Sequence, residues 1–199
     1  MKKIISKFQY NSPVTLTFAL ISLAVLLLGI VTNGISTNLL FCTYRSYLTD
    51  PLAYLRLFTH VLGHANWAHF SGNMVLFLVL GPMLEEKYGS KLLLAMIVVT
   101  AFVSGLFYVV FYPQNALLGA SGIVFMMIVL SSAAGMEAGR IPITLILVLI
   151  IYIGGEMMSS IGVKDGIAHG AHILGGICGA GFGFLGINRK FGAGIGKRK

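Results

Sequence analysis

The sequence predicts an all-α membrane protein, a bundle of six transmembrane helices with a long interfacial loop between the first and second helices. Composition is the first reason. Of 199 residues, 57% are hydrophobic and only 10% are charged, whereas about a quarter of an average soluble chain is charged. The second reason is that the apolar residues form six runs, each near the roughly 20 residues that a spanning helix needs. Helices are expected because each satisfies its own backbone hydrogen bonds in lipid.

The six runs define one membrane domain. Their approximate bounds are Pro13–Val31, Trp67–Leu84, Leu92–Tyr112, Ala120–Met136, Ile141–Ile161 and Ala168–Ile187. Pro113 ends the third run, and Pro142 lies in the first turn of the fifth, where proline is tolerated. We therefore expect an N-terminal segment over 1–12, a six-helix domain over 13–187 and a basic tail over 188–199.

The long connection, Thr32–Asn66, is too apolar for a simple solvated loop. Its stretch "LLFCTYRSYLTDPLAYLRLF" mixes aromatic residues and arginines with leucines, which is typical of segments that lie in the membrane interface. Lys2, Lys3 and Lys7 precede the first run, as in a secretion signal. The run is long, however, and no small-residue cleavage site follows it, so we expect a retained helix.

The basic residues indicate the topology. If the runs alternate across the membrane, 11 of the 14 lysines and arginines fall on one side and 3 on the other. An excess of basic residues marks the cytoplasmic side, so both termini are expected in the cytoplasm. We expect a multi-pass protein of a bacterial-type cell membrane, with the lipid bilayer around it. The net charge of +8 does not form one patch, and no nucleic-acid partner is expected.

The two cysteines, Cys42 and Cys178, have no CxxC or Cys/His ligand spacing. A zinc site or a redox pair is therefore not expected. We predict no metal and no other cofactor.

Polar residues gather at one membrane depth. In this topology the second, fourth and sixth helices all enter from the outside. Within its first turns the second helix carries His69 and Asn73, the fourth carries Ser121, and the sixth carries His169 and His172. A purely structural account does not require three separate segments to place polar groups at the same level.

Small residues would let these helices meet. His69 and Asn73 are four residues apart and share a helix face. The sixth helix has a strip of glycines after His172, which includes a GxxxG, and such strips allow close packing in membranes. If the fourth helix packs against that strip through Gly122, Ser121 and His172 come within hydrogen-bond reach.

This arrangement predicts catalysis by a Ser–His dyad. A serine hydroxyl becomes a good nucleophile when a neighbouring base takes its proton, and histidine is the usual base. His69, the Asn73 amide and the Ser121 backbone N–H could form an oxyanion hole. Each residue alone has a simpler explanation, since a membrane serine usually bonds back to its own helix. Together they favour the catalytic interpretation, and no acidic residue completes a triad.

The motifs "HANWAHFSGN", "GASG" and "AHGAHILGGICG" together resemble those of rhomboid intramembrane serine proteases. The resemblance spans roughly residues 55–185. It implies a six-helix bundle that cuts single-span transmembrane proteins near the outer membrane face. It further implies that Ser121 is the nucleophile, His172 the base, and His69, Asn73 and the Ser121 N–H the oxyanion hole, with Gly119, Gly122, Phe125 and His169 lining the site.

Other positions match or depart from the family pattern. Arg56 and the stretch "EEKYG", Glu85–Gly89, match it, and we interpret both as structural. Leu55 stands where many members have tryptophan. Phe125 stands where many have a tyrosine stacked on the histidine, so it keeps the ring but loses the hydroxyl.

Two other functions stay open. In a transporter or channel, His69, His172 and Glu156 would form an ion path, but the inverted repeat expected of many transporters is not visible. A catalytically inactive rhomboid-like protein would bind membrane clients without cutting them. Such a protein is expected to lack the serine or the histidine, and this chain keeps both.

Overall fold

The computed structural model describes residues 9–133, 140–148, 150–151 and 167–194, with the backbone alone at 167–169 and 186–194. Its named helices are α2 (Pro13–Val31), α3 (Ile35–Leu40), α4 (Pro51–Thr59), the 3₁₀ helix η1 (His60–Leu62), α5 (Trp67–Tyr88), α6 (Ser90–Phe111), α7 (Ser121–Ala133) and α9 (Ile167–Gly194). An isolated antiparallel bridge pairs Thr43 with Leu117.

The all-helical fold agrees with the sequence. Within the described residues, α2, α5 and α6 are long and apolar enough to cross a membrane, and α7 and the Gly170–Leu185 part of α9 are shorter apolar helices. Residues 143–148 of the fifth predicted run are helical, and its second half lies outside the described residues. The sixth run was expected to end at Ile187, but α9 continues to Gly194, because charged residues do not by themselves stop a helix. Residues 188–194 of the predicted tail are therefore helical, whereas 195–199 and most of the N-terminal segment lie outside the described residues.

The junction between α5 and α6 also differs from the sequence prediction. The second run was expected to end at Leu84, but α5 continues to Tyr88. Its charged last turn remains helical until Gly89, whose φ of 83° ends the helix, a conformation that glycine adopts without strain. The helix α6 then begins directly at Ser90.

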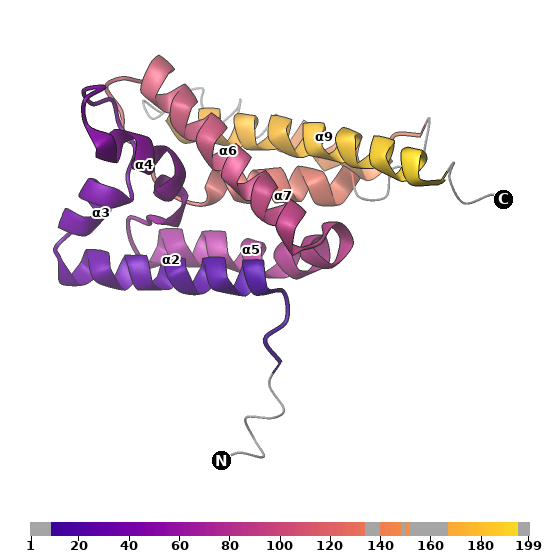
Figure 1. Ribbon diagram of the computed structural model, residues 1–199, viewed down its shortest axis with the longest axis horizontal. Coiled ribbons are helices and arrows are strands. Elements are labelled where there is room, and N and C mark those ends of the chain that lie inside the picture. Colours follow the sequence, from indigo (N-terminus) through magenta and orange to yellow (C-terminus); the bar gives the residue numbers. More distant parts are fainter. Residues whose placement is uncertain (1–8, 134–139, 149, 152–166, 195–199) are drawn as a thin grey trace, which may run out of the picture.

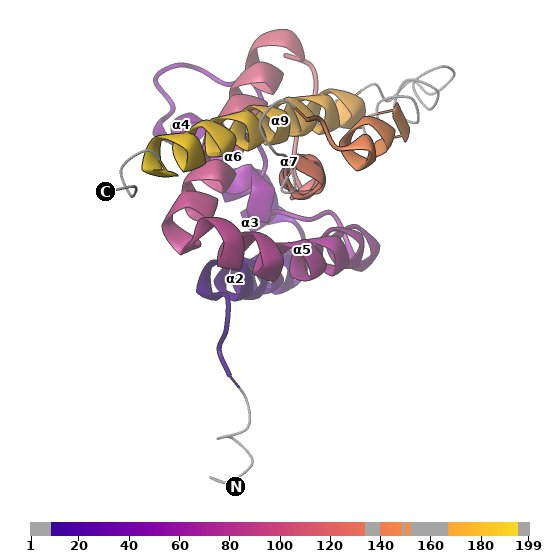
Figure 2. The same ribbon diagram turned by 90° about the vertical axis from the view of Figure 1, so that its right-hand side faces the viewer.

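The helices form two groups around α7. Figure 1 shows α2 and α5 side by side, with α9 on the opposite side of the molecule. Figure 2 shows α7 almost end-on between them, and it contacts α5, α6 and α9. Its side chains Ile123, Met126, Met127 and Leu130 are fully buried. The N-terminus of α7 is therefore held from several sides.

Backbone contact between α7 and α9 confirms the packing predicted through Gly122. A Cβ added to Gly175 would lie 2.0 Å from the Gly122 carbonyl oxygen, and one added to Gly179 would lie 2.4 Å from that of Met126. Only hydrogen atoms at Gly175 and Gly179 let the two helices come this close. A Cβ added to Gly122 would lie 3.3 Å from the carbonyl oxygen of Ala171, the residue before His172.

The segment between α2 and α5 is ordered around one buried arginine. Arg56 of α4 is 1% exposed and donates to the Leu39 carbonyl, the Ser46 hydroxyl and the Asp50 carboxylate. Asp50 also caps α4 by accepting from the Leu52 N–H. The Arg56 guanidinium holds the pKa of the Asp50 carboxyl below its usual range. The structural role expected for Arg56 thus has a physical basis.

Glu85 joins the C-terminal end of α5 to the start of α2. Ser12, before α2, makes no side-chain cap. The Glu85 carboxylate instead accepts from the Val14 N–H at 2.9 Å, the Thr15 N–H at 3.0 Å, the Thr15 hydroxyl at 2.8 Å and the Ser90 hydroxyl at 2.7 Å. A helix leaves its first N–H groups unpaired, and here a carboxylate 70 residues away in the sequence pairs two of them.

Replacing Glu85 with alanine should destabilise the protein. The change leaves buried N–H groups without acceptors, and each such group costs about 1–3 kcal/mol. The neighbouring Glu86→Ala, at an exposed position, is the matched control and should change stability little. Thermal unfolding in detergent measures both variants. Equal melting temperatures for Glu85→Ala and Glu86→Ala would show that the cap contributes nothing.

Candidate active site

One cavity of about 600 Å³ brings the predicted site residues together. Its wall includes Ser121, His172, His69 and Asn73, along with Ala65, Ala68, Gly72, Ala116, Leu117 and Leu118. His69 is in the first turn of α5, Ser121 is the first residue of α7, and His172 is near the start of α9. The three helices thus present these side chains near their N-terminal ends, as the depth argument predicted.

Ser121 is held by the backbone just before it. Gly119 has a φ of 116°, and its N–H donates to the His60 carbonyl at 2.9 Å. A side chain at Gly119 would be strained by this φ, and its Cβ would lie 2.6 Å from Nε2 of His69. Helix α7 begins immediately after Ala120. The Ser121 N–H is therefore among the first N–H groups of the helix, which have no partner within it.

His172 lies against the face of α7 that carries Ser121. Its ring stacks on Phe125 with a centroid distance of 4.1 Å and an interplanar angle of 5°. Phe125 follows Ser121 by four residues, so the two lie on one helix face. The phenyl ring thus orients the imidazole beside the serine. Phe125, which stands where many family members have tyrosine, therefore keeps the stacking contact with the histidine.

His69 and Asn73 lie beside Gly119. The ring nitrogen Nδ1 of His69 accepts from the Ala65 N–H at 3.4 Å. In a neutral imidazole the other nitrogen then carries the hydrogen, so Nε2 is a donor, and it is this atom that approaches Gly119. The Asn73 amide donates one hydrogen to the His69 carbonyl at 3.0 Å, which leaves its second hydrogen available.

Residues 116–118 form a short extended edge along the cavity. Leu117 exchanges two backbone hydrogen bonds with Thr43, of 2.8 and 2.9 Å. Successive residues of an extended chain point their backbone groups to opposite sides, so those of Ala116 and Leu118 point away from Thr43. In the described part of the chain, no hydrogen bond uses the N–H of Ala116 or Leu118. An extended peptide in the cavity could pair with this edge.

Three of the four predicted lining residues, Gly119, Gly122 and Phe125, are not on the cavity wall. Gly119 lies against His69, and Phe125 stacks on His172. Gly122 faces Ala171 across the α7–α9 contact and lies behind the cavity wall. His169 belongs to α9, but its side chain lies outside the described part of the structure. Glu156 also lies outside the described residues. Among the residues that are described, no group of three His, Cys, Asp or Glu side chains could hold a metal.

His60 and His64 support the site and were not assigned a role from the sequence. The His60 carbonyl fixes Gly119, and its ring Nε2 lies 3.1 Å from the Ala101 carbonyl. The His64 ring packs edge-to-face on His69 with a centroid distance of 5.2 Å. Burial lowers the pKa of both His60 and His64 to about 4. The close spacing of His60, His64 and His69 in the sequence could have indicated that His60 and His64 lie near the site.

The buried His60 should make stability depend on pH. Its folded pKa of about 4 lies below the unfolded value of 6.5, so the unfolded state binds more protons in between. The stability that neutral His60 allows is therefore fully present above pH 6.5. It is lost as the pH falls from 6.5 toward 4. We expect a loss of about 2 kcal/mol between pH 7.5 and pH 5, with His64 adding to it. Unfolding measured at both pH values tests this, and His60→Asn should reduce the difference. A wild-type stability that is the same at both pH values would contradict it.

The fold and the cavity define a helical membrane protein with a serine and three polar partners near the ends of its helices. A family model of the rhomboid domain matches residues 51–189, more than half of the chain. The chain therefore belongs to the rhomboid family, whose members are generally intramembrane serine proteases. A search among curated proteins gave no match.

Proposed function

We propose that this protein is an intramembrane serine endopeptidase that cuts single-span transmembrane proteins near the outer membrane face. The observation that carries the proposal is the shared cavity, where Ser121 and His172 face the same space as His69 and Asn73. Family membership supports it. A catalytically inactive client-binding protein of the same family is the alternative, and the presence of both Ser121 and His172 argues against it.

The proposed chemistry is acyl transfer. The Ser121 hydroxyl loses its proton to His172 as its oxygen attacks the peptide carbonyl carbon. The negative charge on the carbonyl oxygen then receives hydrogen bonds from the Ser121 N–H, Nε2–H of His69 and the second Asn73 amide hydrogen. His172 returns the proton to the leaving amine. Water, activated by His172, hydrolyses the ester and frees Ser121.

The cavity also favours a class of substrate. A spanning helix shields its own peptide bonds, so a substrate has to become extended before it is cut, and glycine or proline makes this easier. The edge at Ala116 and Leu118 would then pair with it. Ala65, Ala68 and Gly72 line the cavity with small side chains, and the space around Gly72 is open. We propose a small residue on the acyl side of the bond that is cut.

The proposed membrane arrangement follows from the charge distribution. Six spanning helices, an interfacial segment over 32–66 and cytoplasmic termini place the basic residues on the inner side. The cavity then opens toward the outer face of the cell membrane. Proteolysis of right-side-out vesicles, with epitope tags at both termini, would reveal the orientation.

Labelling with a fluorophosphonate probe tests the function. Such probes phosphonylate an activated serine, whose oxygen bonds to phosphorus as fluoride leaves, so wild-type protein in detergent should be labelled and Ser121→Ala should not. Ser71→Ala is a matched control, because Ser71 is exposed and bonds back to the Ala68 carbonyl. Absence of labelling in a folded wild-type protein, together with retained binding of a single-span client, would favour the inactive alternative.

Loss of one oxyanion donor should lower turnover more than substrate binding. Removing such a donor typically costs a factor of about 10² to 10³ in kcat. We expect this for Asn73→Ala and also for His69→Phe, which keeps a ring near Gly119 but loses the Nε2–H donor. Steady-state kinetics on a reconstituted single-span substrate separates kcat from KM. If KM alone increased, Asn73 would be a substrate anchor and the oxyanion assignment would be wrong.

A further inference from the structure

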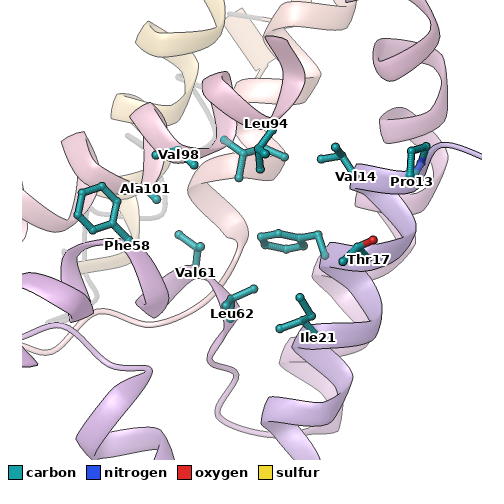
Figure 3. Close-up of a pocket in the computed structure, with 12 residues that line it drawn as sticks. Pro13, Val14, Thr17, Ile21, Phe58, Val61, Leu62, Leu94, Val98 and Ala101 are labelled. Carbon is teal, nitrogen blue, oxygen red and sulfur yellow. The ribbon is translucent and has the colours of Figure 1, made fainter. Parts of the chain in front are cut away.

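A second cavity, of about 450 Å³, lies away from the candidate active site, between α2, α6 and the α4–η1 segment. Eleven of the twelve residues that line it are apolar. Figure 3 shows Val14 and Ile21 of α2, Leu94 and Val98 of α6, and Phe58 around one space. We call this space the α2–α6 groove. The only hydroxyl on its wall, that of Thr17, already forms a hydrogen bond of 2.8 Å with Tyr10.

Two candidate membrane spans, α2 and α6, form sides of the groove. On α2 it extends from Pro13 to Ile21, which corresponds to about 12 Å of helix at 1.5 Å per residue. Phe58, Val61 and Leu62 of the α4–η1 segment also line it. Ile21, Val98 and Phe58 are 44%, 43% and 42% exposed. Because α2 and α6 are candidate membrane spans, the groove opens into lipid.

Its chemistry and size select the occupant. Water is disfavoured, because a bound water needs two to four polar partners and Thr17 is the single polar residue of the wall. A transmembrane helix is too wide, since a cylinder about 10 Å across and 12 Å long fills about 900 Å³, twice the groove. An empty groove would lose the dispersion contacts of its lining. A single extended hydrocarbon chain is narrow enough to fill it.

Charge at the open end indicates the headgroup. Lys91 precedes Leu94 by three residues on α6 and lies on the same helix face, one turn beyond the groove, where it is exposed. Lys2, Lys3 and Lys7 precede the first groove residue, Pro13, in the sequence. The Glu85 carboxylate near Val14 is already paired by four hydrogen bonds. Lysines near a membrane surface attract anionic lipid headgroups.

We propose that the α2–α6 groove binds one acyl chain of an anionic phospholipid, with its headgroup near Lys91. The chain would contact Phe58, Val61 and Leu62 and so support the α4–η1 segment from the side opposite the candidate site. Binding requires no catalytic activity, so the proposal stands or falls independently of the proposed function.

Photocrosslinking tests the site with two matched pairs of variants. The probe is phosphatidylglycerol with a photoactivatable acyl chain, in vesicles that contain the full chain. Val98→Trp fills the groove, whereas Val99→Trp changes the neighbouring valine, which is 45% exposed and does not line the groove. Ile21→Trp and Leu20→Trp form the same pair on α2. If the tryptophan of one pair prevents folding, the other pair still tests whether the groove binds the acyl chain.

In the wild type, crosslinks should concentrate on peptides containing Phe58, Leu62 and Leu94. The indole of Val98→Trp or Ile21→Trp takes the space of the chain, which returns to lipid as apolar as the groove and loses its packing contacts there. Crosslinking in both variants should therefore be largely lost. Val99→Trp and Leu20→Trp should label like the wild type. Equal labelling within each pair, or wild-type labels spread evenly over the lipid-facing surfaces, would show only ordinary boundary lipid and would overturn the site.

The headgroup assignment has its own measurement. Competition by unlabelled phosphatidylglycerol should be stronger than by unlabelled phosphatidylcholine in the wild type. Lys91→Glu should remove that difference while leaving crosslinks to Phe58 in place. Equal competition by the two lipids in the wild type would overturn the anionic preference.

Discussion

Ser121→Ala should abolish cleavage of a single-span substrate, and His172→Ala should reduce it nearly as far. The serine oxygen is the atom that forms the ester, and His172 is the base that makes it nucleophilic. Residues that act as one catalytic unit lose activity together, by factors of about 10⁴ to 10⁶ when one is removed. The double variant should therefore be no slower than Ser121→Ala. Cleavage in proteoliposomes, followed by product mass, measures all three.

The control for this experiment is another serine of the same helix. Ser132 of α7 donates to the Ile128 carbonyl one turn before it, which is the ordinary behaviour of a membrane serine. Ser132→Ala should keep wild-type turnover. Near-normal turnover in a folded His172→Ala protein would show that another group is the base. It would leave the nucleophile assignment to be judged by Ser121→Ala alone.

The sequence could predict those parts of the site that depend on helix periodicity. His69 and Asn73 share a face because they are four residues apart, and Ser121 and Phe125 do so for the same reason. The approach of α7 to α9 was also predictable, because a strip of glycines favours close contact between membrane helices. These features depend on local sequence, and the structure places them as expected.

Features that depend on long-range pairing could not be predicted. Nothing in the sequence near Glu85 shows that it caps a helix at Val14 and Thr15. The pairing of Thr43 with Leu117 joins backbone atoms, and backbone atoms carry no sequence signal. The end of α5 was missed because its last turn is charged, and charge was taken as the end of the apolar run. It marks only where the helix leaves the hydrocarbon.

Gly175→Ala should greatly reduce turnover, although Gly175 is not among the residues that line the cavity. Its added Cβ would lie 2.0 Å from the Gly122 carbonyl oxygen and 3.2 Å from the Gly122 Cα. Both are backbone atoms, so no side chain can rotate away and α9 has to move relative to α7. Ser121 is the neighbour of Gly122, and His172 lies one turn before Gly175. A shift of about 1 Å between catalytic groups can cost a factor of about 10² in rate.

The neighbouring glycine provides the control. A Cβ added to Gly176 would lie 3.7 Å from the Val129 side chain, an ordinary contact, so Gly176→Ala should keep its activity. It should also gain slightly in helix stability, because alanine is favoured over glycine in a helix by about 1 kcal/mol. Comparing the two variants removes the effect of helix propensity, which is the same for both. Gly175→Ala should show reduced kcat and reduced fluorophosphonate labelling while its helix content stays normal. Equal turnover in Gly175→Ala and Gly176→Ala would mean that the α7–α9 contact does not set the distance between Ser121 and His172, and that the base reaches the serine by other means.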